Sequence, residues 1–319
     1  MSEDSKETKL DANAVINTAA GANDNIGENN NVNAYDNTNA VKQTKTSTQE
    51  NFPVGSFLIP AKLRPHVFAY YNFARRADDI ADSAVLSSDE KIAKLDRLEN
   101  VLLGKETEDE STSVAVCLAK SLEMTRINHE LATDLLIAFR QDARGYQYDT
   151  FFELMNYCKY SACPVGRYML ELVGEAKETY HSSDILCSAL QIINHIQDAK
   201  KDWLELGRAY LPMNFMKEQN LTYDCLAKDV ESPEFTAVKM KMTELTRGLL
   251  KDSAALPLLM FNYGLRSEVC VIHNLAVRLL EKLEKNDILA CHLKLSKADW
   301  ILGTLCGIGN GICRKKINY

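Results

Sequence analysis

Apolar side chains recur every three or four residues through most of the chain from Asn51 onward. This spacing places them on one face of an α-helix, as over residues 130–140 and 185–203. No stretch alternates apolar and polar residues as a half-buried strand would, and glycines are too sparse for a nucleotide-binding strand–loop–helix unit. The pattern predicts an all-α fold, with one helical domain over residues 50–300.

Two of the expected helices carry local start signals. Ser87-Ser88-Asp89-Glu90 has the capping-box pattern, and the periodic run that follows it stops near Gly104. Ser232 followed by Pro233 predicts a helix start before the run Phe235–Leu250, because proline is tolerated in the first helical turn.

Residues 1–49 differ in composition from the rest of the chain. They contain ten Asn, no Pro and one aromatic residue, Tyr35, with no helical or strand period. Such a segment buries too little apolar surface to offset the entropy of ordering it. We expect a disordered Asn-rich N-terminal tail that acts as a spacer or as a binding segment.

The composition of the chain limits which binding partners and which cellular compartment are expected. The formal net charge is −7, whereas a protein that coats nucleic acid needs an excess of Lys and Arg. Nine cysteines, an odd number at irregular spacing, favour free thiols in a reducing compartment. The first twenty residues lack the pattern of a signal peptide, and no apolar run reaches the roughly 20 residues of a membrane-spanning helix. We expect a cytoplasmic protein that binds no nucleic acid.

A first acidic motif lies within residues 71–82. In a helix, Tyr71, Arg75, Asp78 and Asp82 are separated by four, three and four residues, so their side chains share one face. Two carboxylates one turn apart repel each other. A divalent cation between them would relieve that repulsion.

A second motif lies within residues 191–202. Gln191, Asn194, Asp198 and Asp202 follow at intervals of three, four and four residues and form a polar stripe bordered by apolar residues. A polar stripe inside an apolar run indicates a face turned towards an internal cavity. Its oxygen ligands are those that Mg²⁺ prefers, with water and phosphate oxygens completing the octahedron.

Each motif alone has a simpler interpretation, namely a solvated acidic face paired with neighbouring Arg and Lys residues. Two such motifs, each with amide or cationic partners on the same face, favour metal binding over surface ion pairs. Calcium loops are excluded because neither motif has the mid-loop glycine and alternating oxygens that they require. We interpret His195 as a packing residue, since imidazole is a poor ligand for Mg²⁺.

Three ordered blocks of the sequence resemble the squalene/phytoene synthase family. The blocks are Leu58-Ile59-Pro60 with residues 70–82, Tyr157-Cys158-Lys159-Tyr160-Ser161-Ala162-Cys163-Pro164-Val165-Gly166-Arg167, and Asn194-x-x-x-Asp198-x-x-x-Asp202 with Gly207-Arg208-Ala209-Tyr210-Leu211-Pro212. The resemblance implies a single-domain isoprenoid-synthase helical bundle around a central cavity. It also implies that two acidic helices face each other across that cavity.

The resemblance further implies Mg²⁺ as cofactor, a prenyl diphosphate as substrate, and roles for individual residues. The implied Mg²⁺ ligands, direct or through water, are Asp78, Asp82, Asn194, Asp198 and Asp202. The implied catalytic or diphosphate contacts are Tyr71, Arg75, Tyr157 and Gln191. Further diphosphate candidates, for each of which a structural ion pair is an equal alternative, are Arg167, Lys201 and Arg208.

One segment points to a branch of the family. Glu50-Asn51-Phe52-Pro53-Val54 replaces the Ser-rich segment of phytoene- and squalene-type members and resembles bacterial hydroxysqualene synthases of hopanoid synthesis. Members of that branch convert presqualene diphosphate and water to hydroxysqualene and diphosphate. The resemblance therefore implies a carbon–oxygen lyase of squalene and hopanoid biosynthesis that needs no nicotinamide cofactor. Asn51 or Glu50 is a candidate to hold the capturing water, although a surface cap is the simpler role.

Two alternatives stay open. The first is head-to-head condensation of two farnesyl diphosphates to presqualene diphosphate, squalene or dehydrosqualene. The second is a non-catalytic homologue that acts as an assembly factor, which the presence of all four motif aspartates disfavours.

A carbocation formed in such a reaction needs an apolar, aromatic-lined cavity. Candidates to line it, each of which fits a plain core position as well, are Phe52, Phe73, Tyr157, Tyr160 and Leu190. Pro164 and Gly166 are expected to interrupt their helix. The apolar and then basic segment 301–319 suits peripheral contact with the inner face of a membrane, and ordinary helix packing explains it equally well.

Overall fold

The computed structural model describes residues 58–313, 316 and 317, and every regular element in that part of the chain is a helix. This confirms the predicted all-α class. The expected tail at residues 1–49 and the segment Glu50–Val54 lie outside the described residues. The α-helices are α2 (Arg64–Ala81), α3 (Ser88–Leu102), α4 (Ser113–Thr125), α5 (Glu130–Ala143), α6 (Phe151–Ser161), α7 (Cys163–Leu172), α8 (Tyr180–Leu206), α9 (Met213–Glu218), α10 (Pro233–Ser253), α11 (Leu256–Leu259), α12 (Tyr263–Lys285) and α13 (Lys297–Ile312). Four short 3₁₀ helices are Ala61–Leu63, Glu110–Thr112, Lys177–Thr179 and Tyr223–Ala227.

The local start signals act as predicted. Ser87 accepts a hydrogen bond from the backbone N–H of Glu90, whose carboxylate accepts one from the N–H of Ser87 at 2.8 Å, so the capping box of α3 is closed. Ser232 caps α10 in the same way by accepting from the N–H of Phe235. The longest helix, α8, ends where Gly207 takes a left-handed conformation with φ 65°. Glycine adopts this conformation without steric cost.

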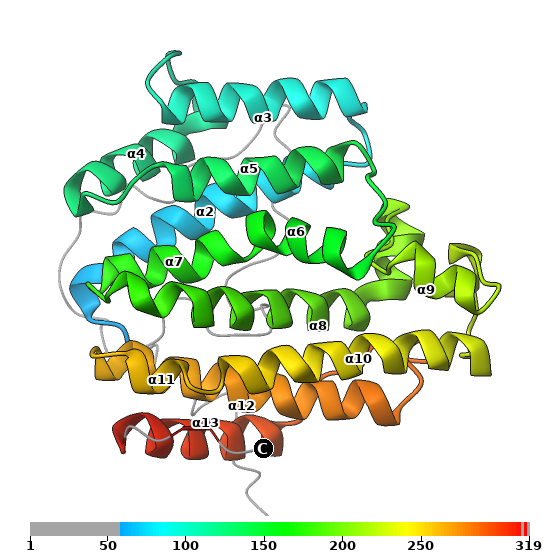
Figure 1. The fold of residues 1–319 in the computed structure, drawn as a ribbon. Coiled ribbons are helices and arrows are strands. Elements are labelled where there is room, and N and C mark those ends of the chain that lie inside the picture. Colours follow the sequence, from blue (N-terminus) through cyan, green and yellow to red (C-terminus); the bar gives the residue numbers. More distant parts are fainter. Residues whose placement is uncertain (1–57, 314–315, 318–319) are drawn as a thin grey trace, which may run out of the picture. The chain divides into compact units, whose positions relative to one another are not determined.

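Helix α8 runs through the middle of the bundle (Figure 1). One group of buried apolar side chains joins α8 to α6, α10 and α12. A second group joins α2, α3, α4 and α5. Helix α7 contributes to both groups, and its Met169 packs against each. The chain thus builds two apolar clusters, and α7 and α8 lie at the border where the cavity described below is found.

The helix interruption expected at Pro164 is present, but Gly166 does not cause it. Helix α6 ends at Ser161, Ala162 leaves the helical region with φ −128°, and α7 begins with Pro164 in its first turn. Gly166 lies inside α7, where it faces α8. A Cβ at this position would lie 2.5 Å from the Sγ of Cys187 and 2.7 Å from the Oγ of Ser183. The glycine therefore permits close packing of α7 on α8.

Helix α13 packs along α12 and crosses residue 300, where the sequence analysis drew a boundary. Its Gly303, Gly307 and Gly311 are buried against α12, and a Cβ at Gly307 would lie 2.5 Å from the Cα of Val271. Within the described part of the chain, no helix combines the length and the apolar character that crossing a bilayer requires.

Candidate active site

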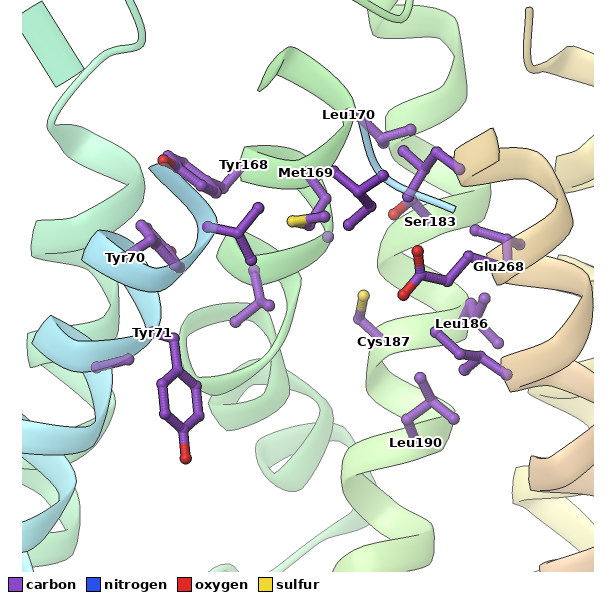
Figure 2. Close-up of a pocket in the computed structure, with 18 of the residues that line it drawn as sticks. Tyr70, Tyr71, Tyr168, Met169, Leu170, Ser183, Leu186, Cys187, Leu190 and Glu268 are labelled. Carbon is purple, nitrogen blue, oxygen red and sulfur yellow. The ribbon is translucent and has the colours of Figure 1, made fainter. Parts of the chain in front are cut away.

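A cavity of about 420 Å³ lies between α2, α7, α8 and α12. Figure 2 shows it with α2 on one side, α12 on the other, and α7 and α8 between them. Most of its lining is apolar. The rings of Tyr70 and Tyr168 stack with centroids 4.0 Å apart in this wall, and their hydroxyls donate to the backbone carbonyls of Leu131 and His66. The hydroxyl groups of both tyrosines in this aromatic wall are thus hydrogen-bonded to the backbone.

Helix α2 supplies the charged end of this cavity through Arg75 and Asp78, with Tyr71 beside them. Arg75 is buried, and its Nη2 lies 2.9 Å from the carboxylate of Asp78 and 2.8 Å from that of Asp79. Burial and the repulsion of Asp82 raise the pKa of Asp78 to about 7, although Arg75 acts in the opposite direction. A negative charge on Asp78 is therefore unfavourable because the side chain is buried and lies near another carboxylate.

Helix α8 approaches the same end with the second motif. Asn194 lines the cavity, and Asp198 and Asp202 follow one and two turns later. The Oδ1 of Asp198 lies 2.7 Å from the Nε2 of His292, an exposed residue. Burial and then the carboxylates of Asp198 and Asp82 raise the pKa of Asp202 to about 8.

A buried arginine joins the ends of the two motifs. Arg208, two residues past the end of α8, donates from Nη1 to the Oδ1 of Asp82 at 2.5 Å and from Nη2 to the carbonyl of Ala81 at 2.6 Å. The negative charge of Asp82 also helps to raise the pKa of Asp202, so the two carboxylates lie near each other. The two acidic motifs therefore meet at one end of the cavity, as the resemblance implied.

The arrangement fits a divalent cation bound with its substrate. Carboxylates from two helices share one region, and burial, followed by repulsion from nearby carboxylates, raises the pKa values of Asp78 and Asp202. Among the described residues, no three His, Cys, Asp or Glu side chains converge on a single ion. Mg²⁺ commonly takes one or two carboxylates and completes its shell with water and phosphate oxygens. The residues present therefore suit Mg²⁺ ions held between the two helices and a diphosphate.

The sequence analysis missed Asp142, a buried carboxylate at the end of α5. It accepts hydrogen bonds from the hydroxyls of Tyr157 at 2.9 Å and Tyr210 at 2.7 Å. Burial raises its pKa to about 6, while the positive charge of Arg208 lowers it. A signal was present in the sequence, because Asp142 continues the apolar stripe Leu131, Leu135 and Ala138 at spacings of four, three and four. A carboxylate on the buried stripe of a helix needs buried partners.

The chain is similar to known proteins along most of its length. The squalene/phytoene synthase family matches residues 46–299. The chain belongs to the squalene/phytoene synthase family. A hydroxysqualene synthase of Rhodopseudomonas palustris is 38% identical over 85% of this chain and 92% of its own length, and one of Sinorhizobium fredii is 36% identical over 84% and 90%. The crystal structure of squalene synthase HpnC from Alicyclobacillus acidocaldarius has a TM-score of 0.63 at 28% identity, covering 73% of this chain and 87% of that one.

The squalene/phytoene synthase match contains all the candidate residues, which the fold places at different distances from the cavity. Tyr71, Arg75, Asp78 and Asn194 line it. Asp82, Asp198 and Asp202 lie at the charged end beside Arg208, which forms the ion pair that the sequence analysis gave as its alternative role. Gln191 is half-buried on α8. Tyr157 is buried and bonded to Asp142.

Two of the cationic candidates lie in ordinary ion pairs. Arg167 bonds both oxygens of Asp184, at 2.9 and 2.5 Å. Lys201 is exposed, with its Nζ 3.9 Å from Glu205. Their contacts with diphosphate stay predictions.

The expected cavity lining is found only in part among the described residues. Leu190 lines the cavity, whereas Phe73 is fully buried in the cluster of α2–α5 and Tyr160 packs at the edge of the α8 cluster. His195 is a packing residue: its ring stacks on Tyr210 at 3.8 Å, and burial lowers its pKa to about 3.

Proposed function

We propose that this protein converts presqualene diphosphate and water to hydroxysqualene and diphosphate, as a Mg²⁺-dependent carbon–oxygen lyase of squalene and hopanoid biosynthesis. The observation that carries the proposal is its 36–38% identity, along 80–85% of this chain, to three proteins named hydroxysqualene synthase. The geometry supports it, because an acidic end and an apolar cavity adjoin. This arrangement suits a substrate with a charged head and a long hydrocarbon tail.

The residues at the acidic end would bind and orient the head group. Asp78, Asp82, Asn194, Asp198 and Asp202 would hold Mg²⁺, directly or through water. Bound Mg²⁺ would neutralise the diphosphate oxygens as the C–O bond breaks. Tyr71, Arg75 and Gln191 would contact the diphosphate or steady this end, and Tyr157 would support it through Asp142.

The walls would hold the hydrocarbon and exclude bulk water. The stacked rings of Tyr70 and Tyr168 face a cavity with few polar groups. An aromatic ring face stabilises a nearby cation, and an apolar wall keeps stray nucleophiles away from it. One water must still reach the cation if the product is an alcohol.

The decisive experiment is incubation of the purified protein with presqualene diphosphate and Mg²⁺, without reductant, in water labelled with heavy oxygen. We expect a C30 alcohol that carries one label, and no product after the metal is removed with a chelator. A hydrocarbon that forms only with NADPH would overturn the assignment in favour of a squalene synthase. Presqualene diphosphate formed from farnesyl diphosphate alone would favour the condensing enzyme, and inactivity towards both substrates would favour the assembly factor.

We also propose that the protein works in the cytoplasm, in peripheral contact with the inner face of the membrane. All nine cysteines are free thiols, which suits a reducing compartment. Ile301, Leu302, Leu305 and Ile312 of α13 are exposed, and such side chains can rest on a lipid surface. Co-sedimentation with vesicles that contain anionic lipid tests the contact, which Leu305→Glu should weaken. Equal sedimentation of both proteins would argue against it.

A further inference from the structure

Glu268 is a buried carboxylate in the wall of the cavity, on the side opposite the acidic motif of α2. It belongs to α12, is 3% exposed and lines the cavity together with Leu265, Val269 and Ile272 of the same helix. Figure 2 shows its carboxylate pointing from α12 into the cavity, with α2 and Tyr71 on the far side. Asp78 and Glu268 are the two carboxylates of the described cavity lining, and they stand on different walls.

Glu268 shares the lining of the cavity with two side chains of α8 that can form hydrogen bonds. These are Ser183 and Cys187, which Figure 2 shows in the wall formed by α8. Gly166 holds α7 against the same two residues, since a Cβ there would lie within 3 Å of both side chains. The backbone behind this region therefore has little freedom to move. A cavity with polar groups in its lining can hold an ordered water, whereas purely apolar cavities stay dry.

The placement of this carboxylate matches a requirement of the proposed reaction. A carboxylate in this wall offers oxygen acceptors that Leu or Met in the same place would not offer. The proposed reaction needs one water held near the cation, away from the departing diphosphate, and a base that takes its proton. Glu268 lies across the cavity from the diphosphate end and is suited to both tasks.

We propose that Glu268 is the catalytic base that orients the capturing water. This inference rests on the proposed function. In the step, the C–O bond to diphosphate breaks and leaves its electron pair on diphosphate. The cyclopropane ring of the resulting cation opens by rearrangement of its C–C bonds. The oxygen of one water, held by the Glu268 carboxylate, forms a new C–O bond to the opened cation, and one proton of that water passes to the carboxylate. Presqualene diphosphate and water thus give hydroxysqualene, diphosphate and a proton, without an oxidant or reductant.

The test compares wild type with Glu268→Gln in the presqualene diphosphate assay, measuring released diphosphate and the C30 products separately. Ionisation depends on the acidic end, so diphosphate release should persist within about tenfold. The share of alcohol among the C30 products should fall at least about tenfold, because the water loses its base. Hydrocarbons formed by proton loss from the cation should take its place.

Two further variants keep the test decisive. Glu268→Leu matches the apolar wall and must show the same loss of alcohol, which covers the case in which Glu268→Gln does not fold. Glu175→Gln is the matched control. Glu175 is also buried, but it accepts hydrogen bonds from the backbone N–H groups of Phe261 and Asn262 outside the cavity lining. This variant should keep the wild-type share of alcohol.

An unchanged alcohol share in Glu268→Gln or Glu268→Leu would overturn the inference. A parallel fall of diphosphate release and alcohol would also overturn it, because Glu268 would then act before water capture. The alcohol made by the wild-type protein alone tests the proposed function. If wild type makes no alcohol, both proposals fall. If it makes alcohol and the variants do too, only the role of Glu268 falls.

Discussion

Arg208 and Asp82 lie 126 residues apart in the chain and form a partly buried ion pair at 2.5 Å that links the end of α2 to the end of α8. The arginine is 7% exposed and also bonds the carbonyl of Ala81. Its charge lowers the pKa values of Asp142 and Asp202, which burial raises. One side chain thus helps to hold three carboxylates at the charged end of the cavity.

We expect Arg208→Gln to lower the free energy of unfolding by about 3–5 kcal/mol, because it leaves buried carboxylates without a counter-charge. Urea denaturation measures this change. Arg167→Gln is the control: its partner is Asp184 and its side chain is 32% exposed, so the loss should stay near 1 kcal/mol or below. Similar losses for the two variants would show that the Arg208–Asp82 ion pair stabilises the fold no more than the Arg167–Asp184 pair does.

Asp198→Asn and Asp202→Asn should each reduce turnover by about 10²-fold or more while the fold is retained. The substitution keeps the size of the side chain and removes a negative charge that the metal and diphosphate need. Steady-state assays with circular dichroism measure both properties. Asp229→Asn is the control, since Asp229 pairs with Lys200 of α8 but is 97% exposed. Near-normal turnover in Asp198→Asn, with Mg²⁺ still required, would mean that the metal lies elsewhere.

Gly307→Ala should lower stability whereas Gly309→Ala should not, although both residues lie in α13. A Cβ at Gly307 would lie 2.5 Å from the backbone of Val271, so its substitution should cost about 1–3 kcal/mol. A Cβ at Gly309 meets nothing within 4 Å, so alanine should leave stability unchanged or raise it by up to about 1 kcal/mol. Thermal melting of both variants tests the close approach of α13 to α12, and equal melting temperatures would contradict it.

His195 should make the protein less stable in acid. Burial lowers its pKa to about 3, so the folded state excludes a proton that the unfolded state binds below about 6.5. The free energy of unfolding is therefore not reduced by His195 above about pH 6.5. It decreases progressively as the pH falls from there towards 3. At pH 4.5 this loss amounts to about 2–3 kcal/mol.

The measurement is the free energy of unfolding at pH 6.5 and 4.5. His195→Phe keeps a ring against Tyr210 and should show a smaller decrease between the two pH values than wild type. His181→Phe changes an exposed histidine and should keep the wild-type decrease. An identical decrease in wild type and His195→Phe would assign the acid sensitivity to other groups.

The sequence by itself determined the features that depend on neighbours within one or two helical turns. Helix type follows from apolar spacing, and the caps at Ser87 and Ser232 follow from side chains that reach the backbone three residues away. The shared faces of the two acidic motifs follow from the same periodicity, because 3.6 residues per turn is a local property.

Only the tertiary structure decided which of these faces meet and which polar groups are buried. Asp82 and Asp202 lie in one region because the bundle brings the ends of α2 and α8 together, and Arg208 forms an ion pair with Asp82 there. Glu268 belongs to an amphipathic helix with no motif around it, so its place in the cavity wall emerges only when α12 packs beside α8. Local periodicity sets the face of a helix on which a side chain stands, whereas burial and charge pairing depend on segments a hundred or more residues away.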